Sequence, residues 1–162
     1  MGCGVAEVRV GQGFDVHAFS DDPARRMVLA GVEFDGPGLV GHSDADAVAH
    51  ACIDALLGAA GLGDIGGRYP DTDERWAGAD SMALLADTVA AVRAEGWEVA
   101  NVDCSVVAEA PRLAPRRDEM RKRLEEVVGA PVRVTGRRAE GLGAFGRGEG
   151  IACLAVALVQ RP

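Results

Sequence analysis

The sequence predicts an α/β fold, an α+β sandwich in which helices pack on one face of a mixed β-sheet. Segments that alternate polar and apolar residues intermix with segments that have the apolar periodicity of amphipathic helices. The chain has 162 residues, 48% of them hydrophobic and 26% charged, which is typical of one globular domain covering 1–162. No internal repeat, low-complexity tract or linker divides it.

The first predicted strand covers 7–17, where polar and apolar residues alternate before the chain reaches Asp15 and His17. Because side chains two positions apart in a strand share a face, Asp15 and His17 are expected on the same side. A short strand pair is predicted at 27–30 and 32–34, bounded by glycines.

An alanine-rich helix is predicted from Ser43 to about Ala60. Ser43 is the expected N-cap, and Asp46, three residues later, is its capping-box partner. Asp46, His50 and Asp54 recur every four residues. We therefore expect these three side chains on one face of the helix.

The glycine-rich segment 61–78 is too long and too polar to be a mere connection, so we expect an ordered loop with a function. A second helix is predicted at 81–94, capped by Asp80 and followed by Gly96. The strand predicted at 97–108 alternates, and one of its faces is polar, with Asn101, Asp103 and Ser105.

Pro115 suits the first turn of a third helix, whose apolar stripe continues to Gly129. Two further strands are predicted at 132–135 and 151–159. Because 151–159 is nearly all apolar, it is expected to be a central strand covered on both faces.

Charge and composition exclude several classes of protein. Seventeen Lys and Arg residues against 25 Asp and Glu residues give a net charge of −8, which disfavours nucleic acid and anionic lipid as partners. No apolar run reaches the roughly 18 residues of a membrane span, and Met1 to Val10 lacks the features of a signal peptide, so we expect a cytoplasmic protein. The cysteines form no C-x-x-C pair and are expected to be free thiols: Cys3, Cys52, Cys104 and Cys153.

Each of the three histidines, His17, His42 and His50, lies close in sequence to an aspartate. Asp15 and His17 from a strand, joined by His50 from a helix, would offer one oxygen and two nitrogens to a zinc ion and leave its fourth position open. Such open sites are typical of catalysis. Alternatively these are ordinary solvated or hydrogen-bonded side chains, and spacing alone does not decide between the two.

Two loops are further candidates for binding. The alternating glycines of 146–150 are consistent with an anion-binding nest to which Arg147 adds charge, or with a plain tight turn. The segment 108–113 lies between a strand and a helix, where small residues would form a slot for a flat base, or an ordinary connection.

Taken together and in this order, the segments resemble one family, the 2-C-methyl-D-erythritol 2,4-cyclodiphosphate synthases of the non-mevalonate isoprenoid pathway. The resemblance covers nearly the whole chain. It rests on Gly-Phe-Asp-Val-His-Ala-Phe at 13–19, His-Ser-Asp-Ala-Asp-Ala-Val-Ala-His at 42–50, Asp-Ala-Leu-Leu-Gly-Ala-Ala at 54–60, Gly-Asp-Ile-Gly at 63–66, Pro-Asp-Thr-Asp at 70–73, Gly-Ala-Asp-Ser at 78–81, Asn-Val-Asp at 101–103 and Gly-Arg-Gly-Glu-Gly-Ile-Ala at 146–152.

The resemblance implies a homotrimer whose sheets face a threefold axis, with active sites between subunits. It also implies a phosphorus–oxygen lyase reaction that depends on metal ions. In that reaction the 2-phosphate of 4-diphosphocytidyl-2-C-methyl-D-erythritol 2-phosphate attacks the β-phosphorus of the same molecule. CMP leaves, and 2-C-methyl-D-erythritol 2,4-cyclodiphosphate is formed.

The resemblance further implies roles for particular residues. Asp15, His17 and His50 would hold Zn²⁺ near the substrate, and Glu140 would help to hold Mg²⁺ or Mn²⁺ on the diphosphate. His42 and Ser43 would meet the phosphates at the start of the helix, where His42 would help to stabilise the transition state. Two further groups of residues would contact the substrate. The residues around its erythritol part would be Asp64, Ile65, Gly66, Tyr69, Asp71 and Asp73. A loop of the adjacent subunit would hold the cytosine with Ala108, Ala110, Pro111, Arg112 and Leu113.

The sequence departs from the family pattern at two places before the glycine-rich turn. Where the family has threonines, this chain has Arg137 and Arg138, and Arg138 replaces the threonine that touches phosphate. A guanidinium can bind phosphate through two hydrogen bonds, so Arg138 is a candidate catalytic residue and Arg137 a candidate substrate contact. Arg147 is a further candidate substrate contact. Near it, Ala144-Phe145 replaces the usual Phe-Thr. This replacement leaves open whether a channel on the trimer axis holds a ligand.

Three functions follow from these observations. The first is an active cyclodiphosphate synthase. It is favoured by the metal-ligand set, the Pro-Asp-Thr-Asp motif and Glu140. The second is a diverged, non-catalytic member that binds a nucleotide or an isoprenoid diphosphate, as Arg137 and Arg138 would suggest. The third is a zinc hydrolase that acts on a small phosphate ester.

Overall fold

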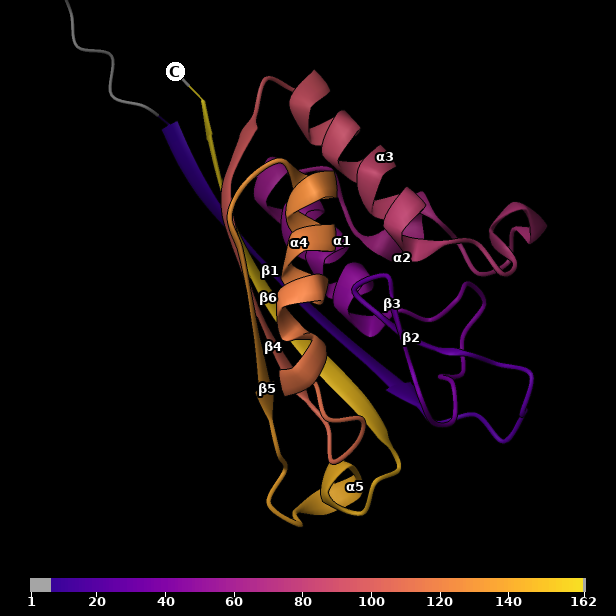
Figure 1. Cartoon of the computed structure of the whole chain (residues 1–162). Coiled ribbons are helices and arrows are strands. Elements are labelled where there is room, and N and C mark those ends of the chain that lie inside the picture. Colours follow the sequence, from indigo (N-terminus) through magenta and orange to yellow (C-terminus); the bar gives the residue numbers. More distant parts are fainter. Residues whose placement is uncertain (1–6, 162) are drawn as a thin grey trace, which may run out of the picture.

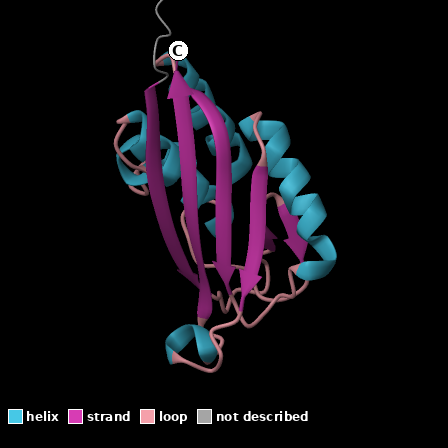
Figure 2. Ribbon diagram, turned by 90° about the vertical axis from the view of Figure 1, so that its left-hand side faces the viewer, coloured by secondary structure: helices cyan, strands magenta, loops and turns pink. Residues whose placement is uncertain are grey.

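A computed structural model of the chain describes residues 7–161. Its centre is a four-stranded sheet in the order β1-β6-β4-β5, which Figure 2 shows side by side. The strands are β1 Glu7–Ala18, β6 Gly150–Arg161, β4 Glu98–Val107 and β5 Val132–Arg137. β4 and β5 run parallel while the other neighbours are antiparallel, so the sheet is mixed, as predicted.

Three long helices cover one face of this sheet (Figure 1): α1 Ala47–Ala60, α3 Ser81–Ala94 and α4 Arg117–Val128. The predicted sandwich with helices on one side is therefore confirmed for the single chain. The smaller elements are the hairpin β2 Met27–Leu29 and β3 Val32–Phe34, the short helices α2 Ile65–Arg68 and α5 Gly143–Gly146, and 3₁₀ turns at Glu74–Trp76 and Ala114–Arg116.

Glycines in β1 bring α1 directly onto the sheet. A Cβ atom on Gly11 would lie 1.9 Å from the carbonyl oxygen of Ala55, and one on Gly13 would lie 1.9 Å from that of Ala51. Only glycine permits so close an approach of a helix backbone. The face of β1 toward the helices therefore carries glycines, and its valines point to the other side.

The first helix begins later than predicted. Its N-cap is Asp46, whose carboxylate accepts hydrogen bonds from the backbone N–H groups of Val48 and Ala49. The predicted cap at Ser43 is therefore wrong. The reason is that Ala45 has a φ of 60°, in the left-handed region, so the chain cannot be helical before it.

The carboxylate of Asp46 also accepts hydrogen bonds from the N–H groups of Ala30 and Gly31. The side chain of Asp46 thus faces the β2–β3 turn. The prediction that it shares a helix face with His50 and Asp54 is wrong for Asp46, because this capping residue lies before the first helical residue. Asp46 also occupies the first N–H groups of α1. These N–H groups are therefore not free to bind an anion.

The strand β6 is central, as predicted, but only one of its faces is covered in the chain. Leu154 and Val156 are 38% and 45% exposed, so the prediction of cover on both faces is wrong for the single chain. The strand register places Phe14 and Ser105 on either side of Leu154. This bare face of the sheet also carries the other exposed valines of β1 and the polar residues predicted for β4: Val8, Val10, Val16, Asn101 and Asp103.

Several other predictions are confirmed. Asp80 caps α3, and Gly129, in the left-handed region, ends α4. Cys52, Cys104 and Cys153 are buried free thiols, whereas Cys3 lies outside the described residues. Between residues 7 and 161, no helix combines the length and the apolar character that crossing a bilayer requires.

Candidate functional site

The end of β1 and the first turn of α1 bring three metal-ligating side chains together. Nε2 of His17 lies 2.8 Å from Oδ2 of Asp15, and Nδ1 of His50 lies 3.1 Å from the same oxygen. The two nitrogens are 3.2 Å apart. The ligand atoms all lie within 4.8 Å of one another, so the group predicted from sequence is assembled.

Hydrogen bonds outside the group orient both imidazoles. Nδ1 of His17 lies 2.6 Å from the carbonyl oxygen of Val40. Because a carbonyl only accepts, Nδ1 carries a hydrogen, and Nε2 is the nitrogen directed at Asp15 and His50. Nε2 of His50 is likewise bonded outside the group, to serine hydroxyls. One carboxylate oxygen and two imidazole nitrogens at a common point form the ligand set of an open zinc site.

Charge in the group favours a cation. Burial raises the pKa of Asp15, but hydrogen bonds from His17 and His50 outweigh it and hold that pKa well below its usual range. Burial lowers the pKa of His17, but the hydrogen bond and the charge of Asp15 outweigh it and raise that pKa above 6.5. Both shifts have the sign expected where positive charge, from a proton or a metal ion, is stabilised among the three side chains.

The three side chains open into a cavity of about 380 Å³. Six further residues predicted for the site line it: His42, Ser43, Ile65, Gly66, Tyr69 and Asp71. Asp64 and Asp73, also predicted, do not. Their carboxylates cap short helical turns, accepting hydrogen bonds from the N–H groups of Gly67 at 2.7 Å and Arg75 at 3.0 Å.

The backbone of the following loop holds His42 at the edge of this cavity. Nε2 of His42 donates to the carbonyl oxygen of Asp73 at 3.0 Å, and the carbonyl oxygen of His42 accepts from the N–H of Gly78 at 2.7 Å. These contacts fix the imidazole of His42 at the edge of the cavity.

Tyr69 and Trp76 form an aromatic part of the cavity wall. Their rings meet edge to face, with centroids 5.2 Å apart and planes at 81°. The hydroxyl of Tyr69 lies 2.9 Å from the carbonyl oxygen of Leu84 and 2.9 Å from Oγ1 of Thr88, so it anchors the wall to α3. Sequence reasoning missed Trp76, although an aromatic residue three positions after the Pro-Asp-Thr-Asp motif was a usable signal.

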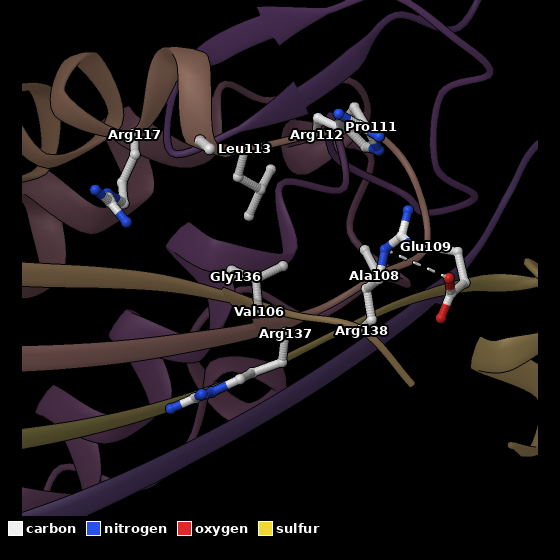
Figure 3. Close-up of a pocket in the computed structure, with 11 residues that line it drawn as sticks. Val106, Ala108, Glu109, Pro111, Arg112, Leu113, Arg117, Gly136, Arg137 and Arg138 are labelled. Atoms are coloured by element: carbon white, nitrogen blue, oxygen red, sulfur yellow. Dashed lines mark ion pairs between the residues drawn. The ribbon is translucent and has the colours of Figure 1, made fainter. Parts of the chain in front are cut away.

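A second cavity, of about 200 Å³, lies where β4 and β5 end. Figure 3 shows the arginines around it. The predicted residues in its lining are Ala108, Pro111, Arg112, Leu113, Arg137 and Arg138, while the predicted Ala110 is not among them. Glu109, from the predicted loop 108–113, also lines it, as does Arg117, which sequence reasoning missed.

Glu109 ties the two loops of the second cavity together. Its Oε1 accepts a hydrogen bond from the N–H of Ala139 at 2.9 Å, and its Oε2 lies 3.9 Å from Nε of Arg138 (Figure 3). Glu140, the residue after Ala139, lies in neither cavity. Arg147 also lies in neither cavity, and its guanidinium pairs with Glu149 at 2.6 Å.

The two cavities lie at the same end of the sheet but at different edges. His17, near the end of β1, is opposite Ile151 at the start of β6, and the ends of β4 and β5 pair at Val107 and Arg137. β6 and β4 separate β1 from β5 in the sheet. One chain therefore presents two separate cavities, one with the metal ligands and one with the arginines.

The family model described as the YgbB family matches residues 8–160. A bifunctional enzyme IspD/IspF of Anaeromyxobacter sp. (strain Fw109-5) is 53% identical over 96% of this chain, and the chain spans only 41% of that relative's length. The 2-C-methyl-D-erythritol 2,4-cyclodiphosphate synthase of Aromatoleum aromaticum is 51% identical, with 96% of each chain covered.

Solved structures agree with these relatives. The bifunctional IspDF of Campylobacter jejuni has a TM-score of 0.92 at 40% identity, covering 98% of this chain and 43% of that one. IspF of Plasmodium falciparum, solved as a CDP complex, has a TM-score of 0.82 at 29% identity, covering 94% of this chain and 95% of that one. The chain therefore belongs to the YgbB family.

Proposed function

We propose that this chain is a 2-C-methyl-D-erythritol 2,4-cyclodiphosphate synthase domain. It converts 4-diphosphocytidyl-2-C-methyl-D-erythritol 2-phosphate to the 2,4-cyclodiphosphate and CMP. The observation that carries the proposal is the convergence of Asp15, His17 and His50 at one end of the 380 Å³ cavity. The synthase of Aromatoleum aromaticum and the bifunctional IspD/IspF of Anaeromyxobacter, each matching 96% of the chain, support it.

Asp15, His17 and His50 are the residues that would hold Zn²⁺, because their donor atoms are those that zinc prefers and their outer hydrogen bonds free the correct lone pairs. When bound, zinc supplies Lewis acidity and a fixed position for a phosphate oxygen. Glu140 is proposed to help hold Mg²⁺ or Mn²⁺ on the diphosphate. Its position outside both cavities of the single chain fits a site completed by another subunit.

The chain's own residues bring the reacting groups together. A phosphate oxygen of the substrate attacks the β-phosphorus, the bond from that phosphorus to the bridging oxygen breaks, and CMP departs with that oxygen. Since both reacting groups are negative, the site must neutralise oxygens and hold the substrate folded. We assign His42 and Arg138 to the phosphates, the Ile65–Gly66 backbone to the erythritol hydroxyls, and the loop 108–113 to cytosine.

The separation of the metal ligands and the arginines into two cavities of one chain supports an assembly of several copies. We propose a homotrimer in which the first cavity of one subunit meets the second cavity of its neighbour. The exposed apolar residues Phe14, Leu154 and Val156 on the bare face would be buried between sheets around the threefold axis. Relatives solved with CDP support a cytidine diphosphate ligand for such a joint site.

Phosphorus NMR of the purified protein with substrate, Zn²⁺ and Mg²⁺ tests the proposal. A cyclic diphosphate together with CMP is the expected result. Binding without turnover would instead support the diverged, non-catalytic member, for which the pairing of Arg138 with Glu109 is the motivating observation. An open-chain hydrolysis product would identify a phosphate-ester hydrolase.

A further inference from the structure

Two buried serines surround the outer nitrogen of His50. Nε2 of His50 lies 2.9 Å from Oγ of Ser81 and 3.1 Å from Oγ of Ser43. His50 is 9% exposed, Ser43 is 8% exposed and Ser81 is fully buried. Buried polar atoms need hydrogen-bond partners. The direction of each hydrogen bond here therefore decides whether the next atom donates or accepts.

The carboxylate of Asp44 sets these directions. An ionised carboxylate only accepts, so the short contact between Oγ of Ser81 and Oδ1 of Asp44 is donated by the serine hydroxyl. The lone pairs of Ser81 Oγ are then left to accept, and Nε2 of His50 must be the donor. In the neutral imidazole, a hydrogen on Nε2 leaves the lone pair on Nδ1.

That lone pair is directed at the metal position. Nδ1 of His50 is 3.1 Å from Oδ2 of Asp15 and 3.2 Å from Nε2 of His17. We propose that Asp44 and Ser81 are positioning residues that hold His50 in its Nε2–H tautomer, so that Nδ1 binds the divalent cation. This inference rests on the metal site of the proposed function, to which it adds two residues that contact neither metal nor substrate.

The backbone holds this chain of hydrogen bonds in place. The N–H of Asp44 donates to the carbonyl oxygen of Ala79 at 3.0 Å, and the N–H of Ser81 donates to Oδ2 of Asp44 at 3.1 Å. Ser81 is the first residue of α3. Its hydrogen bonds with Asp44 therefore join the start of α3 to the segment that precedes α1. The orientation of His50 is therefore built in before any metal binds.

The test measures zinc binding and the His50 tautomer separately from turnover. Metal-free wild type, Ser81→Ala and Asp44→Asn are titrated with Zn²⁺ against a chromophoric chelator, and ¹⁵N shifts report which nitrogen of His50 carries hydrogen. Asp44→Asn is included because it leaves both serine hydroxyls in place. Ser20→Ala is the matched control, since among residues 7–161 the Ser20 hydroxyl accepts only from the N–H of Asp22.

Zinc affinity is expected to fall about 10- to 100-fold in Ser81→Ala and Asp44→Asn. The same variants are expected to lose the Nε2–H tautomer, while Ser20→Ala matches wild type. If wild type binds one zinc ion and Ser81→Ala binds it within twofold with an unchanged tautomer, the positioning role is overturned while the metal site stands. If wild type binds no zinc, both the metal site and this inference fail.

Discussion

Gly13 lies against the backbone of Ala51, so that a Cβ atom on the glycine would be 1.9 Å from the alanine carbonyl oxygen. This contact sets the distance between β1 and α1. Asp15 is two residues beyond Gly13, and His50 immediately precedes Ala51. The same contact therefore places a carboxylate from the sheet beside an imidazole from the helix.

Gly13→Ala is expected to lower the free energy of unfolding by about 3 kcal/mol, because α1 must move away from the sheet. Zinc affinity should fall with it, since His50 moves too. Urea unfolding measures the change. The control is Gly58→Ala in α1, where no atom outside the helix's own backbone lies within 4 Å of the added Cβ. This variant should be about 0.5 to 1 kcal/mol more stable than wild type. A Gly13→Ala protein as stable as wild type would contradict the close packing.

Arg138→Thr is expected to change turnover much more than stability. The Arg138 side chain is 60% exposed and its ion pair with Glu109 is long, at 3.9 Å, so its loss should alter the free energy of unfolding by less than about 1 kcal/mol. Steady-state kinetics and urea unfolding on the same samples check both parts. Turnover equal to that of wild type would show that the guanidinium does not meet phosphate.

The stability of the zinc-free protein should depend on pH through Asp15 and His17. The pKa of His17 is raised on folding, so its contribution is complete below the unfolded value of 6.5 and disappears as pH rises through the folded value. The pKa of Asp15 is lowered, so its contribution is complete above the unfolded value of 3.8 and disappears as pH falls through the folded value.

The Tm of the zinc-free protein is therefore expected to be highest between about pH 4 and 6.5, the interval between the two unfolded pKa values. Thermal unfolding in the presence of a chelator measures it. His17→Ala should remove the decline that begins above pH 6.5. Parallel declines in wild type and His17→Ala would show that this pair does not cause the dependence.

Val156→Asp is expected to prevent self-association, because it would bring identical charges together at the proposed threefold axis. Light scattering should show three times the 16.8 kDa of one chain for wild type and a single chain for the variant. Ala90→Asp, on the exposed side of α3, is the control and should remain trimeric. A wild-type protein that is monomeric would refute the assembly.

The sequence predicts the elements well where one local pattern decides the structure. The two-residue period of a strand places Asp15 and His17 on one face, and the caps of α3 and α4 are at Asp80 and Gly129 as expected. Local pattern is misleading at Ser43, because Ala45 adopts a left-handed conformation that no nearby residue announces.

The rest depends on contacts between distant parts of the chain. Glu109 meets the N–H of Ala139 across two loops, and Arg117 reaches the second cavity from the start of α4, neither of which a linear pattern encodes. The apolar run of β6 indicated burial on both faces, but a sequence does not say whether a helix or another subunit provides the cover. Of the five residues predicted for the substrate that lie in neither cavity, Glu140 remains a proposal for a site shared between subunits.

The most direct test is whether one zinc ion sits among Asp15, His17 and His50. Elemental analysis should find one zinc per chain in wild type and none in His50→Ala, which should remain folded and lose turnover. Anomalous scattering from wild-type crystals at the zinc edge should place the ion within about 2.0 to 2.2 Å of the three ligand atoms. Full zinc content in His50→Ala, or an anomalous peak away from these side chains, would contradict the proposed centre.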